Sequence, residues 1–301
     1  MRRSFALFLA LPVVAFMVSA ASARSYQYDK VVHKAFDAAD LKRISIHAEN
    51  LRVEGWDVDS VEIHAECHVK GHGWYLGGAE FYDVEFRKSG QSLVITEIDK
   101  HDGIFGIMVS RTTDNHFVVR MPRRLAVEVC AEDGHILLHD LNGPVRVEFE
   151  DGHLEIRRTS SPDIRIHFED GSALLSDVQG ALEAEFVDGS FRIRDSNLSV
   201  LRLEFSDGRA EVEAGIIGEG PYRVEFDDGR FEWIFPSTTA ATIEAVTEDG
   251  RITADFLGLQ KTSYRHVFSH TLGNGGPSVE IETQDGRIVF ETAPEMEKQT
   301  E

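Results

Sequence analysis

The chain has 301 residues, which is enough for one large all-β domain or two smaller ones. Its 52 acidic and 31 basic residues give a formal net charge of −21. A surface of this sign repels nucleic acid and anionic lipid, so both are excluded as partners, and cations or basic partners are favoured instead. Solubility in an exposed compartment is the simpler explanation of the same charge.

The first 23 residues have the three parts of a secretory signal peptide. Arg2 and Arg3 form a short basic start, an apolar run covers residues 5–18, and small residues cover 20–23. The apolar run is shorter than the roughly 20 residues of a membrane-spanning helix, and no second run follows it. We therefore predict cleavage after Ala23, no membrane span, and a periplasmic or cell-surface location. The paired arginines also resemble a twin-arginine signal, but ordinary export of the unfolded chain is favoured.

Residues 24–125 are predicted to form an N-terminal β region. Alternating apolar and polar residues at 44–46, 51–57 and 61–65 are typical of half-buried strands. The stretch 71–111 is rich in glycine and aromatic residues and loses this alternation, so we interpret it as a long excursion or as irregular coils. Long loops on a rigid scaffold are where binding residues tend to lie. A disordered insert is the alternative.

The two cysteines are expected to face opposite sides of their strands. Cys67 is in phase with the apolar residues Val61 and Ile63, whereas Cys130 is in phase with the polar Glu128. An oxidising compartment would allow a disulfide. Because the two side chains point in opposite senses, we expect the thiols to stay unpaired.

Residues 126–290 contain a tandem repeat that turns on the dipeptide Asp-Gly. The spacing is 18 to 21 residues, except for a last gap of 36, which we interpret as two repeats of which one has lost its Asp-Gly. A fixed period near 20 residues is typical of a repeat architecture. The aspartates are Asp133, Asp151, Asp170, Asp188, Asp207, Asp228, Asp249 and Asp285.

Each repeat is predicted to have two strands and two turns. Alternating segments lie on both sides of each Asp-Gly, as at 147–150 and 153–156. A second turn is expected halfway round, at Asn142-Gly143, Ser161-Pro162, Gln179-Gly180, Ser196-Asn197 and Gly220-Pro221. The residues two before each Asp are predicted to stack in the core: Phe149, Phe168, Phe186, Phe205 and Phe226. A second core column follows three residues after each Asp: Ile136, Leu154, Ala173, Phe191, Ala210, Phe231, Ile252 and Ile288.

Two architectures fit this pattern. In a β-helix each repeat is one coil and successive aspartates lie about 4.8 Å apart, whereas in an antiparallel β meander or sandwich each Asp-Gly is a hairpin turn and the spacing is about 10 Å. At the shorter spacing two unit charges repel by roughly 3.5 kcal/mol at an effective dielectric of 20, so a β-helix needs a counter-charge. Arginine follows the later aspartates by two residues, which favours the β-helix. That column reads His135, His153, Ser172, Ser190, Arg209, Arg230, Arg251 and Arg287.

These features together resemble a bacterial family of unknown function that is usually labelled adhesin-like or toastrack-like. The resemblance rests on the Asp-Gly repeat behind a signal peptide and on the opening strands at 44–46, 51–57 and 61–65, and it spans Phe36 to Phe290. This chain departs from the usual small-residue-Gly-Asp turns by using Glu-Asp-Gly or Asp-Asp-Gly. The resemblance implies a right-handed single-stranded β-helix or β-roll, and it brings no catalytic residues.

Two groups of residues are candidate metal ligands. The acidic turn residues Asp133, Asp151, Asp170, Asp188, Asp207, Asp228 and Asp249 offer the carboxylate oxygens that Ca²⁺ prefers. The known Ca²⁺-binding β-roll repeat is shorter and richer in glycine, so turn formation is the favoured role. His64, Glu66 and His68 share one face of a strand and could hold Zn²⁺. Their spacing of about 6.6 Å makes ordinary surface histidines the favoured interpretation.

The sequence contains no catalytic signature, and we predict that the chain is not an enzyme and needs no cofactor. A nucleophile elbow, a phosphate-binding loop and a Cys-His pair are all absent from it. We predict an exported scaffold or adhesin-like binding protein of the cell envelope, with a protein or polysaccharide partner. The alternatives are a carbohydrate-active enzyme and a Ca²⁺-binding structural protein. The tail 291–301 is polar and is predicted to be disordered.

Overall fold

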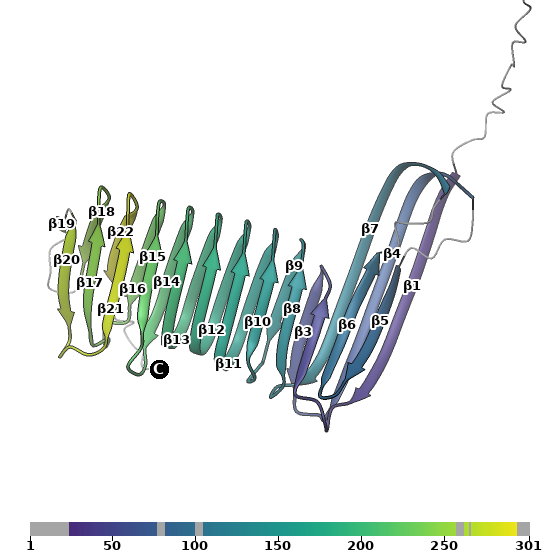
Figure 1. The fold of residues 1–301 in the computed structure, drawn as a ribbon, viewed down its shortest axis with the longest axis horizontal. Coiled ribbons are helices and arrows are strands. Elements are labelled where there is room, and N and C mark those ends of the chain that lie inside the picture. The colour runs from purple at the N-terminus through teal and green to yellow at the C-terminus, as the bar shows by residue number, and fades with distance from the viewer. Residues whose placement is uncertain (1–23, 77–81, 100–104, 257–261, 265, 294–301) are drawn as a thin grey trace, which may run out of the picture.

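The computed structural model describes residues 24–293 apart from 77–81, 100–104, 257–261 and 265 (Figure 1). The predicted signal peptide and most of the predicted tail lie outside these residues. Within them every regular element is a β-strand, and no helix is long and apolar enough to cross a membrane.

The strands are β1 (Arg24–Asp37), β2 (Arg43–His47), β3 (Leu51–Trp56), β4 (Ser60–Leu76), β5 (Tyr82–Ser89), β6 (Ser92–Asp99), β7 (Phe105–Pro122), β8 (Ala126–Ala131), β9 (His135–His139), β10 (Val145–Phe149), β11 (His153–Phe168), β12 (Ser172–Phe186), β13 (Ser190–Phe205), β14 (Arg209–Ile216), β15 (Tyr222–Phe226), β16 (Arg230–Phe235), β17 (Ala241–Thr247), β18 (Arg251–Asp255), β19 (Thr262–Tyr264), β20 (Val267–Leu272), β21 (Ser278–Thr283) and β22 (Arg287–Thr292).

Successive repeats pair side by side as parallel strands, so each repeat is one coil of a solenoid. Phe149 pairs with Phe168, which pairs with Phe186 one coil further on, in unbroken register. Parallel pairing between repeats rules out the antiparallel meander for this part of the chain, because a meander would pair each strand with its hairpin neighbour. The preference for a β-helix over a meander is therefore confirmed.

Two rows of strands make up the coils. Sheet 1 contains the strands that precede the Asp-Gly turns, together with end strands such as β2, β5 and β20. Its spatial order is β5, β6, β2, β8, β10, the second halves of β11, β12 and β13, then β15, β21, β17 and β20. Sheet 2 contains the strands that follow the turns, in the order β1, β4, β7, β3, β9, the first halves of β11, β12 and β13, then β14, β16, β22, β18 and β19.

The coils at both ends are stacked out of chain order. The β21–β22 coil lies between β15–β16 and β17–β18, so the Asp285 turn stacks between the Asp228 and Asp249 turns. At the other end, the β2–β3 coil lies between β6–β7 and β8–β9. The interpretation of the 36-residue gap as a repeat without its Asp-Gly is therefore wrong. The gap contains β19 and β20 and the return of the chain to an inner position.

Antiparallel strands cover both ends of the solenoid. Strands β19 and β20 pair antiparallel with β18 and β17, and β5 pairs antiparallel with β6. The antiparallel strands β1, β4 and β7 extend past the coils as a three-stranded arm, which rises at the right of Figure 1. The region 71–111, predicted to be a long excursion or irregular coils, contains the outer part of this arm and the β5–β6 hairpin in its described residues.

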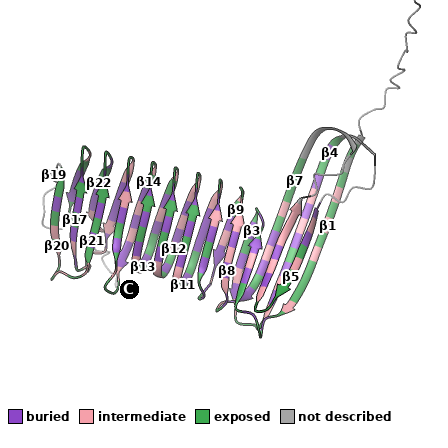
Figure 2. Cartoon of the chain, viewed as in Figure 1, coloured by how far each residue is buried: buried purple, intermediate pink, exposed green. Residues whose placement is uncertain are grey.

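The interior consists of stacked apolar columns, as predicted, and Figure 2 shows buried and exposed residues alternating along the strands. Phe149, Phe168, Phe186, Phe205 and Phe226 are all buried, with neighbouring ring centroids 4.6–4.9 Å apart and ring planes within 9° of parallel. The second predicted column is buried as well. Parallel in-register pairing places identical residues one above another, so the repeat itself produces the ring stack.

The predicted second turns at Asn142-Gly143 and Gly220-Pro221 separate β9 from β10 and β14 from β15, whereas the other three lie inside continuous strands. Strands β11, β12 and β13 keep their hydrogen bonding through the corner, with a register shift in each pairing there. Just before four of the predicted turns lie residues with positive φ, namely Asp140 (62°), Arg158 (44°), Asp177 (53°) and Asp195 (50°). Aspartate accepts this conformation more readily than most residues, because its short side chain bonds locally to the backbone.

Candidate functional site

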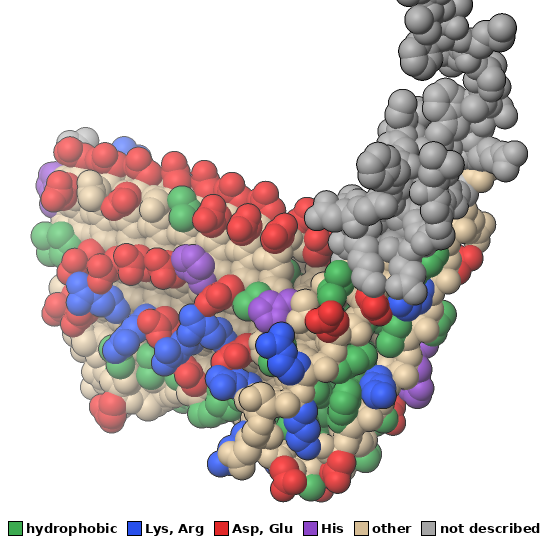
Figure 3. Space-filling model, turned by 45° about the vertical axis from the view of Figure 1, so that its right-hand side comes forward, with side chains coloured by type: hydrophobic (Ala, Val, Ile, Leu, Met, Phe, Trp, Pro, Cys, Tyr) green, Lys and Arg blue, Asp and Glu red, His purple; other side chains and the backbone are tan. Residues whose placement is uncertain are grey.

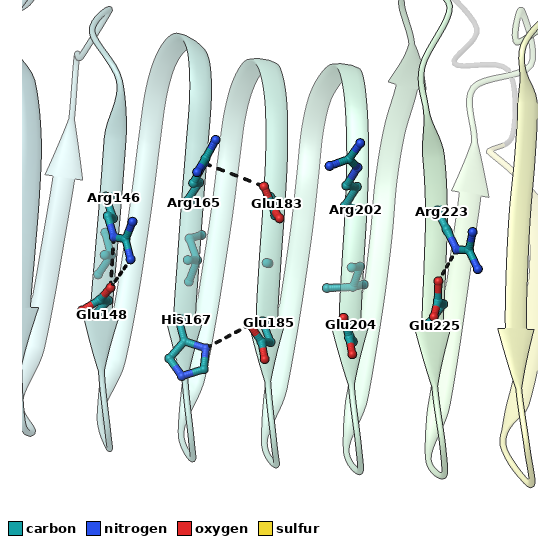
Figure 4. A pocket seen from close by; sticks show the side chains of 14 residues that line it. Arg146, Glu148, Arg165, His167, Glu183, Glu185, Arg202, Glu204, Arg223 and Glu225 are labelled. Atoms are coloured by element: carbon teal, nitrogen blue, oxygen red, sulfur yellow. Dashed lines mark hydrogen bonds and ion pairs between the residues drawn. The ribbon is translucent and has the colours of Figure 1, made fainter.

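The outer face of sheet 1 carries a shallow groove lined by two rows of charged side chains. The groove encloses about 300 Å³, and we call it the charged groove. One row has four arginines and a glutamate, and the other has four glutamates and a histidine (Figures 3 and 4). In coil order the rows are Arg146, Arg165, Glu183, Arg202 and Arg223, and Glu148, His167, Glu185, Glu204 and Glu225.

The rows follow directly from strand geometry. Within each strand the row residues are two apart, so they share the outward face while the residues beside them, such as Val147 and Phe149, are buried. Parallel register then aligns the same position of every coil along the solenoid axis. The sequence signal for this groove was the recurring Arg-x-Glu at 146–148, 202–204 and 223–225, which the sequence analysis did not single out.

Ion pairs run both along and across the strands of the charged groove. Arg146 Nε donates to Glu148 Oε1 at 3.0 Å, while Arg165 reaches Glu183 of the next coil at 3.8 Å. His167 Nδ1 lies 3.5 Å from Glu185 Oε2, also across coils. Exposed pairs of this kind each contribute about 0–1 kcal/mol to stability. The fold therefore depends little on them, which leaves these side chains available for recognition.

The Asp-Gly turns form the edge between the two sheets, and their glycines explain the motif. Gly152 and Gly171 have φ values of 128° and 111°, and a Cβ atom on Gly171 would lie 2.4 Å from the carbonyl oxygen of Gly152. The turns also bond to each other, since the amide of Asp151 donates to Glu132 O at 2.8 Å. Turn formation, the favoured role of the motif, thus has a physical cause in the stacking, whereas Ca²⁺ binding at these aspartates remains a hypothesis.

The arginines that follow the later turns do not pair with the turn aspartates within the described residues. Arg209 lies 3.6 Å from carboxylate oxygens of both Glu211 and Glu232, and Arg230 lies 2.6 Å from Glu232. The arginine column itself is real, because Arg209, Arg230, Arg287 and Arg251 are in register. Arg209 and Arg230 thus pair with glutamates, and the role of the column as counter-charge of the aspartate ladder stays a prediction. The glutamates two positions beyond Arg209 and Arg230 on the same strands, Glu211 and Glu232, are the carboxylates that contact these guanidinium groups.

His64, Glu66 and His68 do not converge on one point. His64 Nε2 lies 2.8 Å from Glu66 Oε1, but His68 Nδ1 lies 2.7 Å from Asp29 Oδ1 on β1. All three side chains are partly exposed on the outer face of the arm. Hydrogen bonds from these histidines lower the pKa values of Glu66 and Asp29. The geometry is that of two separate surface pairs, and metal binding at these residues stays a hypothesis.

A second charged cluster lies at the corner between β9 and β11. His139 Nδ1 and Asp140 Oδ2 are 2.7 Å apart, and Arg158 Nη2 donates to Asp140 Oδ2 at 2.9 Å. The bonds from Arg158 hold the pKa of Asp140 well below its usual range. Because Asp140 has a positive φ, this network holds a corner of the solenoid in place.

The two cysteines are not joined in a disulfide. Cys67 is fully buried on β4, and Cys130 is partly exposed on the outer face of β8. Burial raises the pKa of the Cys130 thiol. The opposite orientations predicted from the alternation are confirmed.

One group of possible metal ligands was missed by the sequence analysis. His135, His153 and Glu155 lie together on sheet 2, with their donor atoms within 4.8 Å of one another. His135 and His153 had been placed in the column two residues after the turns, but Glu155 was not connected with them. The available signal was the His-x-Glu pattern at 153–155 one coil after another histidine at the same position.

Taken together, the fold and the charged groove define a β-solenoid protein with a rigid, charged outer face. The sequence profile of the Toastrack DUF4097 family matches residues 42–290, and the chain belongs to this family. That family is a domain of unknown function, so membership assigns no activity. Among curated proteins none matches the chain.

Three solved structures from bacteria match most of the chain at low identity. Two are described as a "putative adhesin": one from Parabacteroides merdae, at 12% identity, and one from Bacteroides fragilis, at 9%, each with a TM-score of 0.38 and with 88% of this chain and 97% of the other covered. A "putative cell adhesion protein" from Clostridium sporogenes has 9% identity and a TM-score of 0.28, covering 88% of this chain and 100% of its own. At these scores the superpositions carry no argument about function.

Proposed function

We propose that this protein is an exported, non-catalytic, adhesin-like binding protein of the bacterial cell envelope, and that its charged groove binds an extended basic polypeptide segment. The signal peptide, the periplasmic or surface location and the right-handed winding implied by the family are parts of the same proposal. The observation that carries it is the row in the groove that has a glutamate in four of five successive coils, with His167 at the same position of the fifth.

The geometry favours an extended polypeptide over a compact ligand. Neighbouring coils repeat every 4.8 Å or so, and an extended chain advances by about 6.6–6.8 Å for every second residue. Because these two spacings differ, the long, flexible side chains of successive lysines take up the difference when they contact glutamates of neighbouring coils. The arginine row beside the glutamates then fixes the lateral position of the segment, because it repels basic side chains and accepts acidic ones.

A carbohydrate-active enzyme would require one pair of carboxylates set apart from the others. In the charged groove the glutamates instead recur in four of the five coils, and each is accompanied by an arginine or a histidine of the groove. This even arrangement supports binding over catalysis.

The test is binding of a fluorescent, alternating lysine-serine decapeptide to the mature chain, followed by anisotropy at low and at physiological salt. We expect Glu185→Lys/Glu204→Lys to weaken binding at least about tenfold, because two attractive contacts become repulsive. The matched control is Asp40→Lys/Glu85→Lys, which makes the same change in net charge at exposed positions near the N-terminal end.

Equal loss in both variants would show attraction to net charge alone and would overturn the groove assignment. Unchanged binding in the groove variant would overturn it as well. Binding of a neutral polysaccharide in place of the peptide would assign the groove to sugar and overturn the polypeptide proposal.

A further inference from the structure

Two histidines and a glutamate lie together on sheet 2, outside the charged groove. His135 belongs to β9, and His153 and Glu155 belong to the first half of β11. Their donor atoms all lie within 4.8 Å of one another, and no other group of three such donors in the described residues is as close. Nothing in the charged groove or at the corner cluster uses these side chains.

The solenoid register brings the three residues together. His135 and His153 are direct partners in the parallel pairing of β9 and β11, so their side chains leave the same face one strand apart. Their ring centroids are 5.0 Å apart with the planes tilted by 52°. Glu155 is two residues beyond His153 and therefore points out of the same face.

A hydrogen bond from the next coil orients the central histidine. His153 Nδ1 lies 2.6 Å from the hydroxyl oxygen of Ser172, which is its register partner on β12. When Nδ1–H donates to Ser172 Oγ, Nε2 carries the lone pair. An outer partner of this kind fixes the tautomer and ring orientation of metal-binding histidines.

Glu155 is held as a buried carboxylate with one oxygen available. The residue is only 7% exposed. Arg157 Nε donates to Oε1 at 2.6 Å, and its Nη2 contacts the same oxygen. Oε2 of Glu155 makes no hydrogen bond or ion pair with the residues that the structure describes. The guanidinium thus balances the charge and positions the carboxylate, while Oε2 remains a potential ligand.

We propose that His135, His153 and Glu155 bind one divalent transition-metal ion of the Zn²⁺ class. Two imidazoles and a carboxylate suit such an ion, whereas Ca²⁺ prefers oxygen ligands only. Ligands at 2.0–2.2 Å in a tetrahedral arrangement are about 3.4 Å apart, so binding draws the three donors closer together. His135 is exposed, and its side chain can rotate to close the distance. Three protein ligands leave a fourth position for water or for a donor from a partner.

The experiment is calorimetric titration of the untagged mature chain with ZnCl₂, and separately with CaCl₂. We expect a tight Zn²⁺ site that Ca²⁺ does not fill. His135→Gln/His153→Gln should weaken it at least about a hundredfold and Glu155→Gln at least about tenfold. Ser172→Ala should weaken it by about tenfold and change the visible absorption of bound Co²⁺, because the ring of His153 loses its orientation.

The matched control is His64→Gln/His68→Gln, which removes two histidines from the arm and should leave the tight site intact. Circular dichroism establishes that each variant is folded, and His135→Gln alone, at an exposed position, replaces the double variant if that one does not fold. Unchanged Zn²⁺ affinity in the His135 and His153 variants, unchanged affinity in Glu155→Gln, or loss of the site in the control would each overturn the proposal.

Discussion

The two residues of each Asp-Gly turn have different structural roles. The glycine is required at the turn because its positive φ and the close approach of the turn beneath it leave no room for a Cβ atom, as at Gly152 and Gly171. The aspartate lies at the exposed end, where its charge is accommodated by solvent and salt. Each residue of the dipeptide therefore has its own structural reason to recur in every repeat, and neither reason requires a bound ion.

Substitution of one stacked glycine tests this account. Gly171→Ala should lower the free energy of unfolding by at least about 3 kcal/mol, because the backbone strain adds to a steric overlap with Gly152 O. The control is Gly90→Ala, where φ is 57° but nothing lies within 4 Å of the new atom. It should cost about 1 kcal/mol from the backbone strain alone. Urea denaturation followed by circular dichroism measures both, and equal costs would contradict the stacking explanation.

At the scale of the element, stacking of the end coils out of chain order places the last two strands inside the solenoid. Strands β21 and β22 come last in the chain but pair on both sides, with β15 and β17 and with β16 and β18. Their inward residues Val279, Ile281 and Phe290 are fully buried. The coil that comes last in the chain thus occupies an inner position of the solenoid, while β19 and β20 cover the end of the solenoid.

Truncation distinguishes this arrangement from a solenoid stacked in chain order. A chain that ends at residue 276 should melt at least about 10 °C below a chain that ends at 293. It loses four fully buried side chains, those of Val279, Ile281, Ile288 and Phe290, at about 1.5–3 kcal/mol each. It should also aggregate, since the edges of β15 and β16 become unpaired. Thermal circular dichroism and size-exclusion chromatography measure the two effects. If the last coil lay at the end of the stack, the shorter chain would remain monomeric with nearly the same midpoint.

For the whole molecule, charge is the dominant surface property. The net charge of −21 is concentrated by the parallel register, which repeats the acidic turn residues from coil to coil along one edge. Like charges one strand apart repel each other, and at physiological ionic strength salt largely screens this repulsion only beyond about 8–10 Å. The molecule therefore gains its order from the core columns while its surface opposes compaction.

Raising NaCl from 20 to 500 mM should increase the melting temperature of the mature chain by several degrees, because screening reduces repulsion along the acidic edge. CaCl₂ at equal ionic strength should give the same increase, as expected if the turn aspartates are structural. Thermal circular dichroism with and without EDTA measures both. A much larger increase with Ca²⁺, reversed by EDTA, would instead make the aspartates ion ligands.

The sequence by itself determined what depends on local pattern and period. Alternation identified strands and the inward phase of Cys67, and the fixed spacing of Asp-Gly placed Phe149 to Phe226 in one stack. These features could be predicted because side-chain direction in a strand has a period of two, and because a repeat of constant length returns each residue to the same position of the next coil.

Only the tertiary structure decided which coils are neighbours and which charges meet. The order of the end coils depends on free energy gained by covering exposed edges, which no spacing along the chain records. The pairing of Arg209 with Glu211 and Glu232, and the grouping of Glu155 with two histidines, depend on register across coils and on side-chain rotation. Sequence pattern supplies the columns, and packing in three dimensions determines which of their members lie within reach of one another.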